Sequence, residues 1–306
     1  MAVPGREVDL STLARHLAEH GPHKTLPTER RVRILINGAC IADTLGTAGA
    51  LFVWEHPYYP QLYFPKDALV KNVQGYGIIY EDHQDVKDSN NNTIATTLKV
   101  KVQRKSDNNM KEVKDGFVVF SKDLSGKANP LSNMLKVNFS AAGKCSYLYS
   151  RSLHSPDGHL SDQWLEEDTP IFVHPKDPFK RIDILHSSRS LRVSIKGTVI
   201  AESPTCMQLY ESGLPVRYYI PLTSISTAVL RASKTTTQCP YKGEAEYYDV
   251  VIDGETHKDI VWFYTRPTLE CGTIAGLCCF YNEKVDLELK NGDSWEKLGR
   301  MKTIFS

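Results

Sequence analysis

An internal repeat constrains the fold of this chain more than any other feature of its sequence. Each copy opens with an alternating segment, a glycine turn and a second alternating segment, and later reaches an aromatic segment that ends in proline. The aligned segments are 32–44 (VRILINGACIADT) with 191–203 (LRVSIKGTVIAES), 54–55 (WE) with 210–211 (YE), and 62–65 (LYFP) with 218–221 (YYIP). The chain therefore contains two copies of one folding unit.

The residue pattern predicts strands nearly everywhere. Apolar and polar residues alternate along 98–102 and 285–289, as they do in strands that bury one face. The exception is 9–20, which predicts one short helix that stops at Gly21. The apolar face of this helix consists of Leu10, Leu13, Ala14 and Leu17. We expect an all-β fold with one short N-terminal helix.

A chain of 306 residues is long enough for about two domains. We expect an N-terminal helical segment (1–30), a first β-domain (31–169) and a second β-domain (170–306). The second domain is entered through 174–189, an extended connector whose two prolines disfavour a helix. The first domain carries polar inserts over 81–116, whose composition is typical of hairpin loops and predicts disorder.

Charge and hydropathy exclude several classes of partner. Lys plus Arg number 37 and Asp plus Glu 36, without a basic cluster of the kind that binds phosphates, so nucleic acid is not an expected partner. The first residues lack the apolar core of a signal peptide, and no window approaches the ~18 apolar residues of a membrane span. We expect a soluble, cytoplasmic protein without a membrane partner; the sequence is compatible with an oligomer.

The seven cysteines predict free thiols, because an odd number without a secretory signal does not suit a disulfide framework. Their spacing does not suit structural zinc. The one close pair is Cys278-Cys279, whose side chains point to opposite faces if the pair lies in a strand. We expect no metal site and no cofactor.

The turn CPYKG (239–243) places a thiol, a phenol and an amine close together. Cys239 is interpreted as a small buried side chain, because no histidine is near it in sequence. Tyr241 and Lys242 have two interpretations. In one, Tyr241 packs on the sheet and Lys242 is solvated; in the other, both side chains donate hydrogen bonds to a ligand carbonyl or carboxylate. If the protein is an enzyme, the candidate catalytic residues are Lys242, Tyr241, Arg217 and His174.

Aromatic residues supply the candidate walls of a binding cleft. Trp262 and Tyr264 share one face of a predicted strand, and Arg217 and Tyr219 share one face of another. The alternative is that these rings pack in a hydrophobic core. The candidate substrate-binding residues are Trp54, Tyr63, Tyr219, Trp262 and Tyr264.

Five segments of the second half occur in the order of a known family of small β-domains. They are 174–189 (HPKDPFKRIDILHSSR), 211–221 (ESGLPVRYYIP), 235–248 (TTTQCPYKGEAEYY), 261–264 (VWFY) and 274–286 (IAGLCCFYNEKVD). On these motifs the chain resembles the family known as domain of unknown function 427, sometimes labelled a nucleotidyltransferase domain. The resemblance is close over about 170–290 and weaker over 31–165, and tandem copies are common in that family.

The resemblance implies two tandem β-tent domains of the Mss4-like kind, in which two sheets meet at an angle over an apolar cleft. Relatives in that fold often hold zinc with paired cysteines, which this sequence lacks, so the metal is not carried over. The first copy also lacks a counterpart of CPYKG. The nucleotidyltransferase label finds no glycine-rich phosphate loop before a helix and no pair of closely spaced acids for two metals.

No Ser-His-Asp, Cys-His or paired-carboxylate arrangement can be assembled from spacing. The primary hypothesis is therefore an enzyme of specialised metabolism that needs no cofactor. It would fold a mostly apolar small molecule in an aromatic cleft and cyclise or isomerise it, pericyclic reactions such as the Diels–Alder reaction included. The alternatives are a non-catalytic module that binds a small molecule or peptide, a docking scaffold, and the nucleotidyltransferase of the family label.

Overall fold

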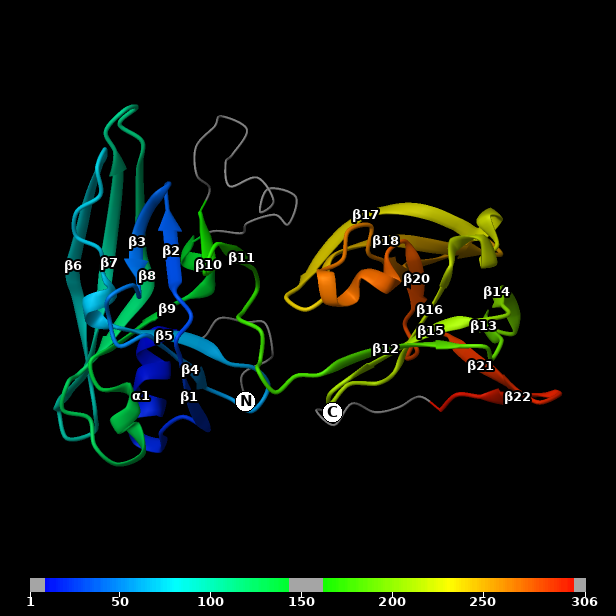
Figure 1. Cartoon of the computed structure of the whole chain (residues 1–306), viewed down its shortest axis with the longest axis horizontal. Coiled ribbons are helices and arrows are strands. Elements are labelled where there is room, and N and C mark those ends of the chain that lie inside the picture. The colour runs from blue at the N-terminus through cyan, green and yellow to red at the C-terminus, as the bar shows by residue number, and fades with distance from the viewer. Residues whose placement is uncertain (1–8, 143–161, 300–306) are drawn as a thin grey trace. The chain divides into compact units, whose positions relative to one another are not determined.

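The computed structural model describes residues 9–142 and 162–299 of the 306-residue chain. The chain divides into two compact units, Met1–Asp177 and Pro178–Ser306, which we call unit 1 and unit 2 (Figure 1). The division lies inside the connector predicted over 174–189, a few residues beyond the domain boundary expected at 170.

Unit 1 consists of two antiparallel sheets. The seven-stranded sheet has the order β1-β4-β5-β9-β8-β7-β6, and the four-stranded sheet has the order β11-β10-β2-β3. The elements are α1 (Leu10–His20), β1 (Lys24–Thr28), β2 (Val32–Ile36), β3 (Ala39–Asp43), β4 (Ala50–Trp54), β5 (Gln61–Pro65), η1 (Lys66–Ala68), β6 (Tyr76–Lys87), β7 (Thr93–Arg104), β8 (Met110–Phe120), η2 (Gly126–Leu131), β9 (Met134–Val137), η3 (Phe139–Ala142), β10 (Gln163–Glu166) and β11 (Thr169–Ile171).

Unit 2 also consists of a seven-stranded and a four-stranded antiparallel sheet. Their orders are β12-β15-β16-β20-β19-β18-β17 and β14-β13-β21-β22. The elements are β12 (Ile182–Ser187), β13 (Leu191–Ile195), β14 (Thr198–Ser203), β15 (Cys206–Glu211), β16 (Arg217–Pro221), η4 (Leu222–Ser224), η5 (Thr227–Val229), β17 (Leu230–Cys239), β18 (Gly243–Ile252), β19 (Glu255–Phe263), η6 (Leu269–Ile274), β20 (Leu277–Phe280), β21 (Asp286–Asn291) and β22 (Ser294–Lys297).

The two units have the same topology. Taken in chain order from β1 and from β12, corresponding strands occupy the same positions in both sheets. The repeat predicted from 32–44 and 191–203 is β2-β3 in unit 1 and β13-β14 in unit 2, each joined by a two-residue turn with positive φ at both positions. The predicted all-β fold with two tandem domains is confirmed.

Each seven-stranded sheet has two covered faces, because its strands alternate apolar residues to both sides. In unit 2, Ile220 and Val261 face a core shared with the four-stranded sheet, whereas Tyr219 and Trp262 face a second cluster. Cys278 belongs to the first cluster and Cys279 to the second, so the adjacent thiols do point to opposite faces. The second cluster is where the two units differ.

Helix α1 covers this second face in unit 1. Asp9 caps the helix by accepting a hydrogen bond from the Thr12 backbone amide at 2.8 Å. The predicted face of Leu10, Leu13, Ala14 and Leu17 is buried in a cluster that includes Val53, Tyr63, Val118 and Phe120 of the sheet. The helix ends at Gly21, whose φ is 73° and where a Cβ would collide with Lys127. No helix among the residues described here is long and apolar enough to cross a membrane.

The disorder predicted for 81–116 is wrong. The segment consists of the end of β6, all of β7 and the start of β8, which are joined by tight turns at 88–92 and 105–109. Strand β6 lies at the sheet edge, and most of its side chains between Tyr80 and Lys87 are exposed or half-buried. An edge strand of this kind tolerates a polar sequence, and charged residues there also prevent further strand pairing.

The packing of α1 makes a prediction about the stability of unit 1. Leu17 is fully buried, whereas Arg15 on the same helix is exposed. We expect Leu17→Ala to lower the free energy of unfolding of unit 1 by about 2–5 kcal/mol because it leaves a cavity under the helix. The matched Arg15→Ala should change it by less than about 0.5 kcal/mol.

Urea denaturation followed by hydrogen-exchange mass spectrometry would measure this effect separately for the two units. Exchange should accelerate in β7 and β8, which α1 covers, and stay unchanged in β18 and β19 of unit 2. Equal effects of the two substitutions on β7 and β8 would contradict the role assigned to α1.

Candidate functional site

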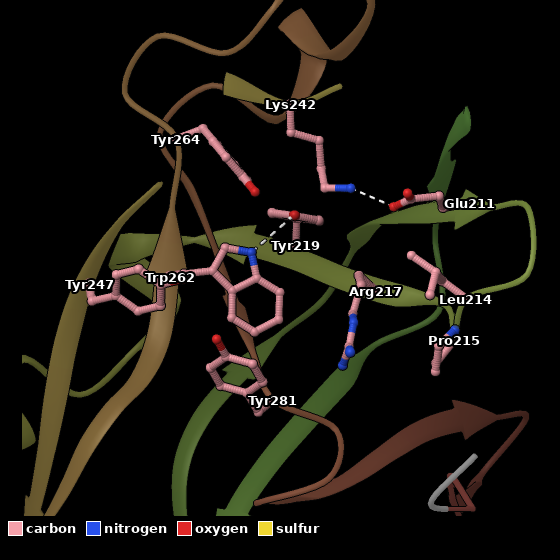
Figure 2. A pocket seen from close by; sticks show the side chains of 10 residues that line it. All are labelled: Glu211, Leu214, Pro215, Arg217, Tyr219, Lys242, Tyr247, Trp262, Tyr264 and Tyr281. Atoms are coloured by element: carbon pink, nitrogen blue, oxygen red, sulfur yellow. Dashed lines mark hydrogen bonds and ion pairs between the residues drawn. The ribbon is translucent and has the colours of Figure 1, made fainter. Parts of the chain in front are cut away.

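Unit 2 contains a cavity of about 170 Å³ on the face of its seven-stranded sheet that carries Tyr219 (Figure 2). The side chains around it are aromatic or charged, with two apolar residues from the β15–β16 loop. The lining residues are Glu211, Leu214, Pro215, Arg217, Tyr219, Lys242, Tyr247, Trp262, Tyr264 and Tyr281.

Neighbouring strands bring the aromatic wall together. Tyr219 of β16 and Trp262 of β19 are both in register with Cys279 of β20, which lies between them. The Trp262 indole Nε1 donates a hydrogen bond to the Tyr219 hydroxyl at 3.2 Å, and the two rings meet edge to face at 89°. Tyr247 of β18 is in register with Trp262 on the other side and exchanges a 2.7 Å hydrogen bond with the Thr237 hydroxyl. The rings are therefore fixed by strand pairing and by hydrogen bonds.

A buried carboxylate lies between two ammonium groups at one end of the cavity. The Nζ atom of Lys242 is 2.5 Å from Oε2 of Glu211, and the Nζ atom of Lys180 is 3.3 Å from Oε1. The exposed fractions of these side chains are 12%, 7% and 14% for Lys242, Glu211 and Lys180. We call this group the Lys-Glu-Lys triad; burial makes its interactions stronger than those of surface ion pairs.

The CPYKG turn is what holds Lys242 in place. It joins β17 to β18, and Gly243 adopts a φ of 106° at the corner. Its backbone is attached to the segment before η6: the Thr268 amide donates to the Lys242 carbonyl at 3.0 Å, and the Thr268 hydroxyl donates to the Tyr241 carbonyl at 2.5 Å. The turn is thus a corner between two strands that also aims an ammonium group at the cavity.

Arg217 lies at the other end of the cavity and has a carboxylate partner. Its two terminal nitrogens donate to the two oxygens of Glu283, each at 2.9 Å, and its guanidinium lies 5.5 Å from the centre of the Trp262 ring. Glu283 is therefore the partner of this arginine, and Glu211 instead holds Lys242.

The protonation states make the cavity rich in hydrogen-bond donors. Burial alone would lower the pKa of Lys242, but Cys239 and Glu211 outweigh it, so that the pKa lies above its ordinary value. Burial raises the pKa values of Tyr219, Tyr264 and Tyr281. At neutral pH these groups are an ammonium and three phenols, all able to donate a proton in a hydrogen bond.

The corresponding face of unit 1 is built differently. Tyr63 is in register with Lys136, as Tyr219 is with Cys279. On the next two strands of unit 1, β8 and β7, the residues in register are Val118 and Thr97. On the corresponding strands of unit 2, β19 and β18, they are Trp262 and Tyr247. The smaller side chains of unit 1 leave room for α1, whereas the rings of unit 2 occupy part of that volume themselves and enclose the cavity.

Two of the predicted substrate-binding residues therefore belong to unit 1 and do not line the cavity. The Tyr63 hydroxyl donates to Oε1 of Glu55 at 2.9 Å, and Lys136 binds the same oxygen at 3.1 Å. The Trp54 indole donates to Asp177 at 3.2 Å. These contacts lie within unit 1.

Of the four candidate catalytic residues, Lys242 and Arg217 line the cavity, and Tyr241 and His174 do not. The Tyr241 carbonyl accepts hydrogen bonds from Thr268 and from the Cys271 thiol. His174 belongs to unit 1, where its ring stacks on Tyr59 with centroids 4.1 Å apart. The three predicted binding residues of unit 2, Tyr219, Trp262 and Tyr264, all line the cavity.

Sequence reasoning missed several lining residues, of which Tyr247, Tyr281 and Glu211 are the most important. Tyr247 lies on the same face of β18 as Ala245, so the alternation of residues along this strand could have identified it. The repeat aligns Glu211 with Glu55, and both acids bind a lysine in their own unit. Nothing in the linear sequence indicates Lys180 as the second partner of Glu211, because it comes from the connector before β12.

The ion pair at Arg217 predicts a dependence of stability on pH. Burial acts to raise the pKa of Glu283, but the hydrogen bonds from Arg217 outweigh it and hold the pKa below its ordinary value of 4.5. A depressed pKa stabilises the fold above the unfolded pKa, and this stabilisation is lost as pH falls through the folded pKa.

Because Glu283 is partly exposed, we expect Glu283→Gln to cost about 0.2–1 kcal/mol at pH 7. The difference between wild type and variant should shrink as pH falls below 4.5. Urea denaturation at pH 7 and at acid pH measures the free energy of unfolding of both proteins. A difference between them that grows toward acid pH would contradict the assigned pair.

Comparisons with known proteins agree with the two-unit architecture. A family model described as "Domain of unknown function (DUF427)" matches residues 24–83 and 183–291, one segment in each unit. None of the curated proteins compared matches the chain. Within the described ranges, 9–142 and 162–299, no group of three or more His, Cys, Asp and Glu side chains is placed to hold a metal ion. The family model covers more than half of the 306 residues, so the chain belongs to the DUF427 family, with one copy of the domain in each unit.

Proposed function

We propose that unit 2 binds a small, mostly apolar organic molecule that carries a carbonyl group, and that it cyclises or isomerises this molecule. The observation that supports this proposal is the ammonium group of Lys242 at the edge of a cavity walled by five aromatic side chains. Apolar walls with a few convergent polar groups are typical of small-molecule sites.

The volume of the cavity limits what it can hold. At about 170 Å³ it is close to an engineered apolar cavity of about 150 Å³ that binds benzene. Complete enclosure of a drug-sized molecule takes about 300–1,000 Å³. We therefore propose that one ring-sized part of the ligand enters the cavity, with the rest of the molecule outside it.

The donors of the cavity suit a carbonyl group whose oxygen gains negative charge during the reaction. An ammonium or a phenol aimed at that oxygen stabilises the transition state more than the ground state, and it does so most strongly where water is excluded. Figure 2 shows the Tyr264 hydroxyl pointing toward the Tyr219 hydroxyl, whereas the Lys242 ammonium points toward Glu211. An oxygen placed between these groups would be polarised from several sides.

The same protonation states indicate which reactions the cavity can support with these residues. Lys242, Tyr219, Tyr264 and Tyr281 keep their protons at neutral pH, so none of the four serves as a general base there. Reactions that need the right conformation and a polarised carbonyl fit them better. Intramolecular cyclisation, pericyclic reactions included, and isomerisation of a conjugated carbonyl compound belong to this class.

Binding without catalysis is the second candidate function, and one observation favours it. Lys242 and Arg217 each already contact a carboxylate of the protein, Glu211 and Glu283. Cations that are paired in this way polarise a substrate less than unpaired ones. Under this alternative the cavity recognises its ligand through the aromatic rings, and the product recovered equals the ligand added.

The proposal predicts that ligand binding depends on Lys242 and does not depend on Cys239. We expect Lys242→Met to weaken the binding of apolar carbonyl compounds about tenfold or more, because it removes a charge-assisted hydrogen bond. Cys239→Ser, a change three residues away in the same turn, should leave binding within about twofold of wild type.

Thermal-shift screening of apolar aldehydes and acids would identify ligands for this test, and chromatography after incubation would detect rearranged product. Product of unchanged mass supports the reaction, and stabilisation with no product supports the binding alternative. A Cys239→Ser protein of wild-type stability that no longer binds would contradict the assignment of Lys242 as the important residue of the turn.

A further inference from the structure

The Lys-Glu-Lys triad does not balance its own charge. Its two ammonium groups, Lys180 and Lys242, bind opposite oxygens of one carboxylate, Glu211. Arg217 and Glu283, at the other end of the cavity, form a neutral pair. Two lysines and one arginine against two glutamates leave one positive charge among these five residues, of which Glu211, Arg217 and Lys242 line the cavity.

In unit 1 the charges at the corresponding position cancel. Glu55, the counterpart of Glu211 in the repeat, binds one ammonium group, that of Lys136, at 3.1 Å. Glu55 also accepts a hydrogen bond from the neutral hydroxyl of Tyr63 at 2.9 Å. One carboxylate and one ammonium carry no net charge, and this face of unit 1 is covered by α1.

The excess charge in unit 2 comes from two residues at specific positions. Lys242 projects from the CPYKG turn between β17 and β18. The turn between β6 and β7 holds the same position in unit 1 and has the sequence DSNNN (88–92), without a cation. Lys180 comes from the segment before β12. Unit 2, which contains the cavity described above, thus also has the extra cation.

A buried charge without a counter-charge is costly, and an anion that reaches it is bound correspondingly well. Around Lys242, the hydroxyls of Tyr219 and Tyr264 add neutral donors to the ammonium (Figure 2). A carboxylate offers about four acceptor positions and can use several donors at once. A neutral carbonyl offers fewer acceptor positions and does not neutralise the excess charge.

We propose that the ligand of unit 2 is a monoanion, a carboxylate attached to a ring-sized apolar group, and that Lys242 recognises the carboxylate. The ring occupies the aromatic cavity and the carboxylate lies at its Lys242 end. This inference rests on the cavity assigned under the proposed function and narrows its ligand from carbonyl compounds in general to organic acids.

Three probes of matched size test the proposal on the full-length protein: benzoate, benzamide and benzylamine. Each presents the same ring, with an anionic, a neutral or a cationic substituent. We expect benzoate to bind at least tenfold more tightly than benzamide, and benzylamine to bind most weakly, with dissociation constants from ligand-observed NMR titration at pH 7.

Two lysine variants then test which residue recognises the carboxylate. Lys242→Met should weaken benzoate about 100-fold and benzamide only about tenfold, because a neutral carbonyl loses less than a carboxylate when the ammonium is removed. The control is Lys290→Met, which removes an exposed lysine of β21 in the same unit and should change none of the three affinities. Thermal melting of each variant shows whether it is folded.

The outcomes separate this inference from the proposed function. If benzamide binds as tightly as benzoate, the cavity is a binding site but the preference for an anion is wrong. The same holds if benzoate loses no affinity in a folded Lys242→Met protein. If none of the three probes binds at concentrations up to about 10 mM, both the anion preference and the assignment of the cavity are wrong.

Discussion

An antiparallel sheet of seven strands has two faces, and in both units of this chain both faces carry apolar side chains that must be kept from water. The four-stranded sheet covers one face in each unit. The other face carries a central buried tyrosine, Tyr63 in unit 1 and Tyr219 in unit 2. The covering of this second face is where the two units differ, because their topology is the same.

The two units cover this second face with different parts of the chain. Unit 1 has small or aliphatic residues around Tyr63 and covers them with α1, whose capped and glycine-terminated sequence forms a short amphipathic helix. Unit 2 is preceded by the connector instead of a helix, and Trp262, Tyr247 and Tyr264 fill its second face with rings. The cavity is lined by these rings. In one copy of the duplicated domain a helix lies on this face, and in the other a cavity lies there.

The sequence predicted the parts of this structure that depend on local pattern. The repeat, the strand-rich fold and α1 all follow from periodicity and turn residues within short windows, and so does the separation of Cys278 from Cys279. Tyr219, Trp262 and Tyr264 were predicted for the same reason. The polar composition of 81–116 was misread as disorder, because an edge hairpin is held by backbone hydrogen bonds that composition does not report.

The remainder of the site depends on contacts between distant segments. Lys180 and Lys242 meet at Glu211, and Arg217 meets Glu283, only once the sheet has formed. His174 and Trp54 were predicted on chemistry alone, and the fold places both in unit 1. A residue type can suggest a role, but only the register of the strands decides which face of which sheet carries it.

The central claim is that the second face of unit 2 accepts a ligand while the same face of unit 1 is occupied by α1. Crystallographic screening with ring-sized fragments tests this claim most directly, because it reports the position of every bound fragment. We expect fragments to bind against Tyr219 and Trp262, near Lys242, and none to bind between α1 and Tyr63. Fragments that bind under α1, or only at the surface of the molecule while the cavity of unit 2 stays empty, would contradict it.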